Sequence, residues 1–174
     1  MKKVVVIGCG GSGKSTLAIK LGAVTGLPVY HLDRIFWLPG WKALPKDIWR
    51  EKQKELVSRE EWIVDGNYGS TLEIRLQASD TIIYLDMPRW LCLYGALKRF
   101  FQYRGKVRPD MTEGCKERIT WEFFSWIWNY RKTKRPETLA MLETLKEEKK
   151  VLIPRSRKEV DAFLRDHLTS KVSR

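Results

Sequence analysis

Short apolar runs alternate along this chain with longer segments in which apolar positions recur at helical spacing. Runs rich in β-branched and aromatic residues predict five strands, at residues 3–7, 28–33, 62–66, 81–86 and 151–154. Helical spacing predicts helices over residues 13–24, 45–58, 89–103, 117–130, 137–148 and 158–167. Nearly continuous apolar strands that alternate with helices indicate an α/β fold, in which helices cover both faces of a parallel sheet.

Three stretches lie outside this alternation. Residues 34–45 contain a Pro-Gly turn signal and are expected to be irregular. Residues 104–115 are polar and are expected to form a mobile loop, and the tail at 168–174 is expected to fray. A proline at position 136 is expected to separate two helices.

The first strand runs directly into a glycine-rich segment, residues 8–16, which reads Gly-Cys-Gly-Gly-Ser-Gly-Lys-Ser-Thr. A loop that wraps a triphosphate must aim several backbone N–H groups at one anion, and glycine reaches the dihedral angles that this requires. The following helix adds the positive end of its dipole. The spacing Gly-x-x-x-x-Gly-Lys-Ser between a strand and a helix therefore indicates a phosphate-binding loop, or P-loop. The candidate nucleotide-binding residues are Gly8, Gly10, Gly11, Ser12, Gly13, Lys14, Ser15 and Thr16.

Two side chains of this loop carry the expected chemistry. Lys14 supplies a positive charge for the β- and γ-phosphates of a nucleotide, and it is a candidate catalytic residue. The Ser15 hydroxyl is placed to ligate Mg²⁺. We therefore expect ATP and Mg²⁺ as cofactors.

Three other predicted strands end in a carboxylate, at Asp33, Asp65 and Asp86. In parallel sheets, binding sites form at the carboxyl ends of the strands, so the P-loop, Asp33, Asp65-Gly66 and Asp86-Met87-Pro88 are expected to converge on one crevice. Asp65 is expected to orient the water shell of Mg²⁺, and Asp33 either shares this role or orients an acceptor hydroxyl. The alternative for Asp33 is a helix cap or turn residue. Asp86 is expected to be structural.

Length and composition suit one globular domain, with 174 residues, 31% charged and 43% hydrophobic. No apolar run approaches the ~20 residues that cross a bilayer, and the first run stops too early for a signal peptide. We therefore expect a cytoplasmic protein without a membrane partner, present as a monomer or homodimer. The three cysteines match no metal-site or disulfide spacing, so free thiols are expected.

The net charge of +12 is unevenly distributed along the chain. Residues 89–135 hold 12 basic and 4 acidic side chains, a net charge of +8. Such a concentration fits a polyanionic partner: a nucleotide, a second phosphorylated substrate or a nucleic acid.

Together these motifs resemble the adenylate-kinase-like P-loop kinases over most of the chain. The segment 8–15 is similar to the ATP cradle of that family, and Asp65-Gly66 is similar to its second acidic motif, whose carboxylate acts on Mg²⁺ through water. The resemblance implies a three-layer, five-stranded parallel sheet in the order 2-3-1-4-5. It also implies one domain, with a core of residues 1–103 and 136–168 and a basic lid of about residues 104–135.

The resemblance further implies roles for several arginines of the basic segment. Arg99, Arg131 and Arg135 occupy positions where such kinases place phosphate-clamping arginines, and they are candidate catalytic residues. The residues expected on the acceptor side are Asp33, Asn67, Arg104 and Arg108.

Some stretches are closer to a bacterial group labelled "DNA topology modulation protein", namely residues 31–33, 62–68, 108–111 and 114–115. Two features of related kinases are missing. Adenylate kinases follow Asp-Gly with Phe-Pro-Arg, whose arginine holds the AMP phosphate, and this chain has Asn-Tyr-Gly there. The Gly-Gly-Gly acceptor loop of shikimate kinases is also absent, so the acceptor is unassigned.

The expected function is ATP-dependent phosphoryl transfer to a small-molecule acceptor, such as a nucleotide, a nucleoside or a similar polar metabolite. The alternative is a nucleic-acid-binding ATPase or regulator that affects DNA topology. The aromatic residues of 121–130 supply rings that can stack on bases, although a helix that is apolar nearly all round more commonly packs in a core. The kinase is favoured because the chain has no recognisable DNA-reading motif and a phosphate-closing lid accounts for the basic segment.

Overall fold

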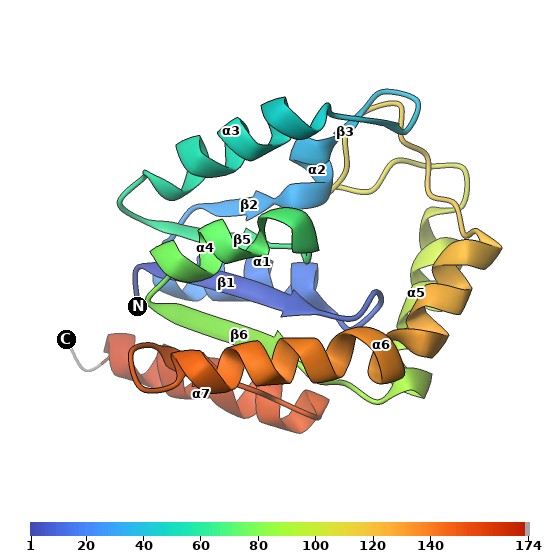
Figure 1. Ribbon diagram of the computed structural model, residues 1–174. Helices are drawn as coiled ribbons and strands as arrows, with labels where there is room; N and C mark the ends of the chain where they lie inside the picture. Colours follow the sequence, from blue (N-terminus) through green and yellow to red (C-terminus); the bar gives the residue numbers. More distant parts are fainter. Residues whose placement is uncertain (173–174) are drawn as a thin grey trace.

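The computed structural model contains a five-stranded parallel sheet with helices on both faces (Figure 1). The structure describes the backbone of residues 1–172 and the side chains of residues 1–166. The strands are β1 (Lys3–Gly8), β2 (Val29–His31), β5 (Trp62–Asp65), β6 (Thr81–Leu85) and β7 (Lys150–Leu152). They lie in the order β2-β5-β1-β6-β7, and every neighbouring pair is parallel. Counted along the chain, this is the expected order 2-3-1-4-5, which is confirmed.

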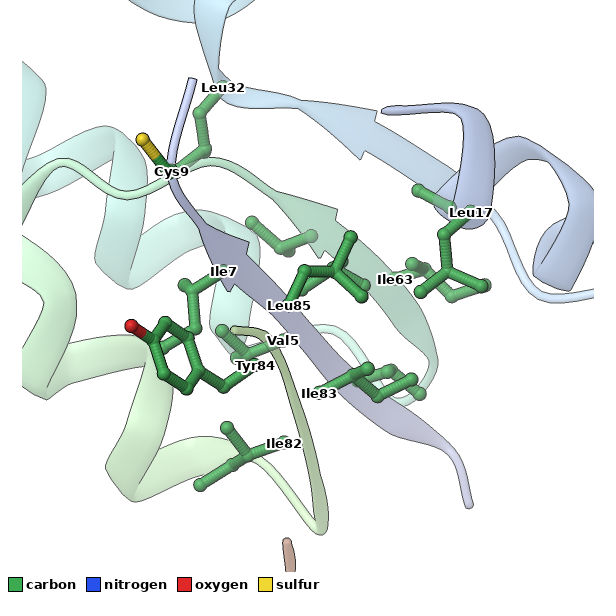
Figure 2. Close-up of a cluster of buried hydrophobic side chains, with 14 of the residues drawn as sticks. Val5, Ile7, Cys9, Leu17, Leu32, Ile63, Ile82, Ile83, Tyr84 and Leu85 are labelled. Atoms are coloured by element: carbon green, nitrogen blue, oxygen red, sulfur yellow. The ribbon is translucent and has the colours of Figure 1, made fainter. Parts of the chain in front are cut away.

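The three central strands carry the core because nearly all of their residues are apolar and buried. Every residue of β5 and β6 is buried, as are residues 4–8 of β1. Figure 2 shows Val5 and Ile7 of β1 among Ile82, Ile83 and Tyr84 of β6. Strands that are apolar on both faces are stable only when both faces are covered.

The helices provide this cover. On one face, α1 (Lys14–Thr25) packs against β1, β2 and β5 and contacts α7 (Arg157–Val172). Toward the other face, α4 (Leu72–Ala78) contacts β1 and packs on α3 (Lys46–Val57). Two further helices, α5 (Arg89–Tyr103) and α6 (Trp121–Leu145), contact each other beside the carboxyl ends of the strands (Figure 1).

The segment 34–45, which was expected to be irregular, is mostly regular. It begins within a short helix, α2 (Leu32–Phe36), and continues as a hairpin of β3 (Trp37–Leu38) and β4 (Lys42–Ala43). The ring of Trp37 contacts the rings of Phe36 and Trp41 at centroid distances of 5.0 and 5.4 Å, and these aromatic contacts hold the short elements together. Asp33 therefore lies in α2 and not at the end of a strand.

Sequence reasoning also missed a short helical region after β5. A 3₁₀ turn, η1 (Gly69–Thr71), leads into the seven-residue α4. Too few apolar positions recur over so short a length for a helical period to stand out.

The expected break at Pro136 is absent. A single helix, α6, runs through this proline, and its N-terminus is at Trp121 and not at Glu117. The Thr120 side chain caps it by accepting a hydrogen bond from the Phe123 amide at 3.2 Å. A proline inside a helix removes one hydrogen bond, but here buried residues on both sides of it, Tyr130 and Leu142, hold the helix against the core.

The closing helix is longer than expected. It extends through 168–172, which were expected to fray, and residues 173–174 lie outside the described part of the chain.

Candidate active site

The P-loop leaves β1 at its carboxyl end and turns through three glycines with positive φ: Gly8 at 146°, Gly11 at 73° and Gly13 at 94°. A side chain at these angles is strained, which explains why the loop needs glycine there. The loop closes on itself where the Ser12 amide donates to the Cys9 carbonyl at 3.2 Å. The first amides of α1 have no acceptor within the helix, so they are available to an anion.

The side chains of the P-loop also suit a bound anion. The Lys14 ammonium donates to the Cys9 carbonyl at 2.9 Å, which places its charge directly over the loop. The Ser12 hydroxyl is buried and has no hydrogen-bond partner among the described residues. Among the described residues, Lys14 forms no ion pair and the Ser12 hydroxyl forms no hydrogen bond. Together with the first amides of α1, these groups suit a polyphosphate.

Helix α5 touches the P-loop backbone directly. A Cβ on Gly11 would meet the Cys92 carbonyl oxygen at 2.1 Å, and a Cβ on Gly95 would meet the Gly11 carbonyl oxygen at 2.2 Å. No side chain fits between the two segments, so α5 fixes the shape of the loop. Gly95 has no motif around it in the sequence, and its role follows only from this contact.

An arginine that the sequence analysis did not select lies over the same loop. A Cβ on Gly13 would meet the Arg157 guanidinium at 2.2 Å. Arg157 comes from the first turn of α7, at the far end of the chain. It therefore adds a second cation beside Lys14.

Two buried thiols lie under the P-loop. Their mutual hydrogen bond raises the pKa of Cys9, and burial raises it further. The same hydrogen bond lowers the pKa of Cys92; burial opposes this, and the charges of Lys14, Arg157 and Arg131 add to the lowering. All three cysteines, Cys115 included, are free, as expected.

One cleft of about 440 Å³ joins the P-loop to the acceptor side. Its lining includes Lys14 and Ser15 from the loop, Asp33 from α2 and Asp65 from β5. The P-loop, Asp33 and Asp65-Gly66 therefore converge on one crevice as expected, whereas Asp86-Met87-Pro88 does not line it, and that part of the prediction is wrong. The rest of the wall is largely aromatic and basic: Trp37, Trp41, Tyr68, Arg99, Arg108, Arg118, Phe123 and Trp126.

Residues 104–120, which follow α5, form part of this wall. This segment docks on the α2 and β3–β4 region through the Thr112 hydroxyl, which donates to the Arg34 carbonyl at 2.7 Å, and through the Trp41 indole, which donates to the Lys116 carbonyl at 3.2 Å. Residues 104–120 thus cover the acceptor side of the cleft.

Asp33 is the carboxylate best placed to meet an acceptor. Its side chain is 43% exposed and lines the cleft. The Tyr68 hydroxyl donates to it at 2.7 Å, and an Arg108 nitrogen lies 3.6 Å away. Burial, followed by the charge of Asp33, raises the pKa of Tyr68, so this hydroxyl keeps its proton and remains a donor.

Glu117 is the centre of a buried ion-pair network that sequence reasoning missed. One of its oxygens accepts from Arg99 at 3.0 Å, and the other lies 2.6 Å from Arg108. Arg108 also donates to Asp110 at 3.1 Å. Because Glu117 is buried and pairs with residues 9 and 18 positions away, no local motif reveals it. The network holds Arg99 and Arg108 at the cleft with their charges largely compensated.

Asp65 is buried at the end of β5 and bonded to a histidine. The His31 Nδ1 lies 2.9 Å from its carboxylate oxygen. Burial lowers the pKa of His31, but the hydrogen bond and charge of Asp65 outweigh burial and raise the pKa overall. Asp65 lines the cleft, and its second carboxylate oxygen forms no side-chain hydrogen bond with the described residues.

Asn67 was expected on the acceptor side, and it lines the cleft, but its side chain bonds to the P-loop. Its side-chain oxygen accepts from the Gly8 amide at 2.9 Å, and its side-chain nitrogen donates to the Gly8 carbonyl at 2.7 Å. Both polar groups are therefore used to tie the turn after β5 to the start of the P-loop.

A buried arginine supports this turn. Arg75 donates to the carbonyls of Gly66 and Asn67 and to the Gln53 side chain at 2.7 Å. Burial lowers its pKa to about 9. Two backbone carbonyls, the Gln53 amide and the Thr71 hydroxyl stabilise this charge. No carboxylate among the described residues pairs with it.

The other predicted arginines divide into two groups. Arg99 lines the cleft and lies over the Phe123 ring, 5.6 Å from its centroid, and Arg131 is close enough to act on Cys92 beneath the loop. Arg135 instead makes two hydrogen bonds of 2.7 Å with Asp86, outside the cleft. This pair fixes α6 to the end of β6, so Asp86 is structural as expected, and Arg135 does not line the cleft; its expected clamping role stays a prediction. Arg104 is exposed and does not line the cleft.

No protein-family model and no curated protein sequence gives a significant match to this chain. Solved structures do match its fold. A shikimate kinase from Acinetobacter baumannii, in complex with shikimate, superposes with a TM-score of 0.58 at 18% identity, over 99% of this chain and 94% of that one. A gluconokinase from Sinorhizobium meliloti gives 0.53 at 17% identity, over 97% and 90%. A sugar kinase from Janibacter sp., in an unliganded structure, gives 0.53 at 18% identity, over 97% and 93%.

At these identities the likeness concerns the fold, which is that of P-loop kinases of the adenylate-kinase-like type. None of these three proteins is named for DNA topology, and that part of the resemblance stays a prediction.

Proposed function

We propose that this protein transfers a phosphoryl group from ATP to a hydroxyl group of a small polar molecule. The observation that carries the proposal is the single cleft in which Lys14 and Ser15 face the exposed carboxylate of Asp33. Phosphoryl transfer needs a phosphate cradle, charge neutralisation and a positioned acceptor, and this cleft offers residues for each. The fold likeness to three small-molecule kinases supports the same reading.

The donor side rests on the P-loop. The first amides of α1 and the Lys14 ammonium would hold the β- and γ-phosphates, with Arg157 and Arg131 adding positive charge nearby. The Ser15 hydroxyl would ligate Mg²⁺, and Asp65 would hold a water of its shell. Bound Mg²⁺ supplies charge neutralisation on the phosphates. Among the described residues no three His, Cys, Asp or Glu side chains form a metal cluster, which fits an ion that arrives with the nucleotide.

On the acceptor side, Asp33 would accept the proton of the attacking hydroxyl. The Tyr68 hydroxyl donates to its carboxylate and an Arg108 nitrogen lies 3.6 Å away, so both hold this carboxylate in place. An Asp positioned in this way suits a hydroxyl acceptor.

The finer identity of the acceptor was expected to be a nucleotide, a nucleoside or a similar polar metabolite. The position at which adenylate kinases hold AMP has Asn67, and its side chain is committed to Gly8. We therefore favour the polar metabolite within that expected set. A hydroxylated ring or chain fits a wall of Trp37, Trp41 and Tyr68, whose faces pack against C–H groups while Asp33 meets a hydroxyl.

The test is an acceptor screen with Mg·ATP, read by ADP release and by phosphate on the product. The panel contains sugar acids, polyols, cyclic hydroxy acids, nucleosides and nucleotides. We expect one hydroxylated class to stimulate ADP release, and Asp33→Asn to abolish transfer while ATP binding by calorimetry is retained. Asp47→Asn, an exposed carboxylate at the start of α3, is the matched control. Transfer that persists in Asp33→Asn, or no stimulation by any acceptor, would overturn the proposal.

A further inference from the structure

The large apolar side chains that remain exposed gather on two helices. Among the described residues there are eleven, and four of them lie elsewhere: Met1, Ile19, Leu38 and Ile48. The other seven are on α5 and α6: Trp90, Tyr94, Leu97, Phe101, Trp121, Trp126 and Trp128. A contiguous apolar patch on a protein surface usually marks an interaction site.

On α5 the exposed residues form one stripe. Trp90, Tyr94, Leu97 and Phe101 are spaced i, i+4, i+7 and i+11, which places them within an arc of about 60° on a helix of 3.6 residues per turn. Trp90 is 68% exposed and Phe101 is 69% exposed. The opposite side of α5, with Cys92 and Ala96, is buried against the P-loop.

A second stripe on α6 continues the first. Trp121, which is 78% exposed, and Trp128 are seven positions apart and share one side of the helix. The rings of Trp90 and Trp128 touch at 5.1 Å, and Arg89 lies over the Trp128 ring at 4.7 Å. We call the six residues of the two stripes the α5–α6 aromatic face: Trp90, Tyr94, Leu97, Phe101, Trp121 and Trp128.

This face is not part of the active site. Neither the cleft described above nor the second cavity, of about 450 Å³ between α4 and α6, is lined by any of the six residues. Substrate therefore does not account for their exposure.

The charge around the face is strongly basic. Helix α5 has no acidic residue, and the only one in residues 121–135 of α6 is Glu122. Two other acidic residues of the basic segment, Asp110 and Glu117, are buried in ion pairs. Lys98 and Lys132 are exposed beside the aromatic stripes and form no ion pair with the described residues. The occupant of this face must therefore be anionic.

Three occupants are conceivable, and two fit poorly. A second copy related by a two-fold axis would bring this basic surface against itself. A single-stranded nucleic acid uses a groove that follows its backbone, and neither of the two cavities described above is lined by this face. An anionic lipid surface requires no groove and brings no second basic surface against the face. Trp, Tyr and Phe insert at the headgroup level from a protruding helix, while Lys and Arg reach the phosphates.

From the sequence, no membrane partner was expected, because no apolar run spans a bilayer. We propose instead that the α5–α6 aromatic face is a peripheral docking surface for membranes that contain anionic lipids. None of the described helices is long and apolar enough to cross a bilayer, so the contact is confined to the interface. The bound protein would lie with α5 and α6 against the headgroups, so docking would place the P-loop, which packs on the opposite side of α5, close to the membrane surface.

The test uses the full chain and extruded vesicles of phosphatidylcholine, with or without phosphatidylserine. We expect co-sedimentation with the phosphatidylserine vesicles only, weakened by added salt, and a blue shift of tryptophan emission. The double variant Trp90→Ser/Phe101→Ser should lower the partition coefficient by about tenfold or more, since two inserting rings are lost. Ile19→Ser/Ile48→Ser removes two exposed apolar residues away from the face and should leave it unchanged.

A second pair of variants probes charge without touching any packed side chain. Lys98→Glu/Lys132→Glu should abolish binding, and Lys20→Glu/Lys52→Glu, with the same change in net charge, should only weaken it. Circular dichroism and ATP calorimetry confirm that each variant is folded, whether or not the protein is a kinase.

Three results would overturn the proposal. One is no binding to the phosphatidylserine vesicles. Another is a wild-type dimer in sedimentation velocity that Trp90→Ser/Phe101→Ser converts to a monomer, which would assign the face to a second copy. The third is salt-sensitive binding of a single-stranded oligonucleotide that is lost in the same variant, which would assign it to nucleic acid.

Discussion

The two sides of the cleft are built in different ways. On the side proposed to bind ATP, eight consecutive residues form the glycine loop, and Asp65, Arg131, Arg157 and α5 join it from elsewhere in the chain. On the acceptor side, Asp33, Tyr68 and the pair Arg108 and Glu117 come from three separate segments and are joined by side-chain contacts. The donor side thus centres on one local segment, and the acceptor side exists only when the chain is folded. The two sides should respond differently to substitution.

The largest expected effect is on the donor side. Lys14→Met removes the charge over the loop and should lower kcat for phosphoryl transfer by about 1000-fold, or about 4 kcal/mol. The fold should be retained, because the Lys14 ammonium contacts only the Cys9 carbonyl among the described residues. Steady-state kinetics and thermal unfolding measure the two quantities. Activity near that of the wild type would show that the loop does not act on phosphates.

Glu117→Gln probes the acceptor side, and its main expected effect is a lower free energy of unfolding. It leaves Arg99 and Arg108 without their shared carboxylate, and breaking a buried ion pair costs about 3 kcal/mol. Urea unfolding should show this loss, and the KM of the acceptor should rise more than that of ATP. Glu113→Gln, an exposed residue of the same segment, is the control and should do neither. Equal changes in both KM values would contradict the division of the cleft.

Gly95→Ala tests the contact through which α5 shapes the P-loop. Alanine favours a helix, yet its Cβ would meet the Gly11 carbonyl oxygen at 2.2 Å. The helix or the loop must move, which should cost about 2 kcal/mol and weaken ATP binding measured by calorimetry. Gly69→Ala has no atom within 4 Å of the new Cβ and serves as the matched substitution. A Gly95→Ala protein that binds ATP normally would show that the loop tolerates displacement.

Tyr68→Phe is the mildest change. It removes one hydrogen bond to a carboxylate and keeps the ring, so transfer should slow by about fivefold, or about 1 kcal/mol, with ATP binding unchanged. Tyr30→Phe removes a hydroxyl that bonds to Arg59 outside the cleft and should have no effect on the rate. A slower reaction in both variants would point to a general effect on stability.

The sequence predictions were accurate for features that neighbouring residues set, and less accurate for contacts between distant residues. The glycine loop after the first strand and the helix at 89–103 follow from local patterns, the order of the sheet follows from the family resemblance, and the structure confirms all three. Arg135 was assigned to phosphates by its position in a resembling family, but it bonds to Asp86, which ends a distant strand. Asn67 was assigned to the acceptor, but its amide matches the backbone of Gly8. Spacing along the chain reveals neither the pairing of Arg135 with Asp86 nor that of Asn67 with Gly8.

By itself, the sequence determined which strands form the buried centre of the sheet and where the glycine loop turns, because strand burial and glycine dihedral angles depend on neighbouring residues. Tertiary structure alone decided which charges pair. Glu117, Arg157 and Gly95 acquired their roles from contacts with residues far along the chain. An ion pair or a close backbone approach depends on distance in space, and only the packing of α5, α6 and α7 around the sheet set those distances.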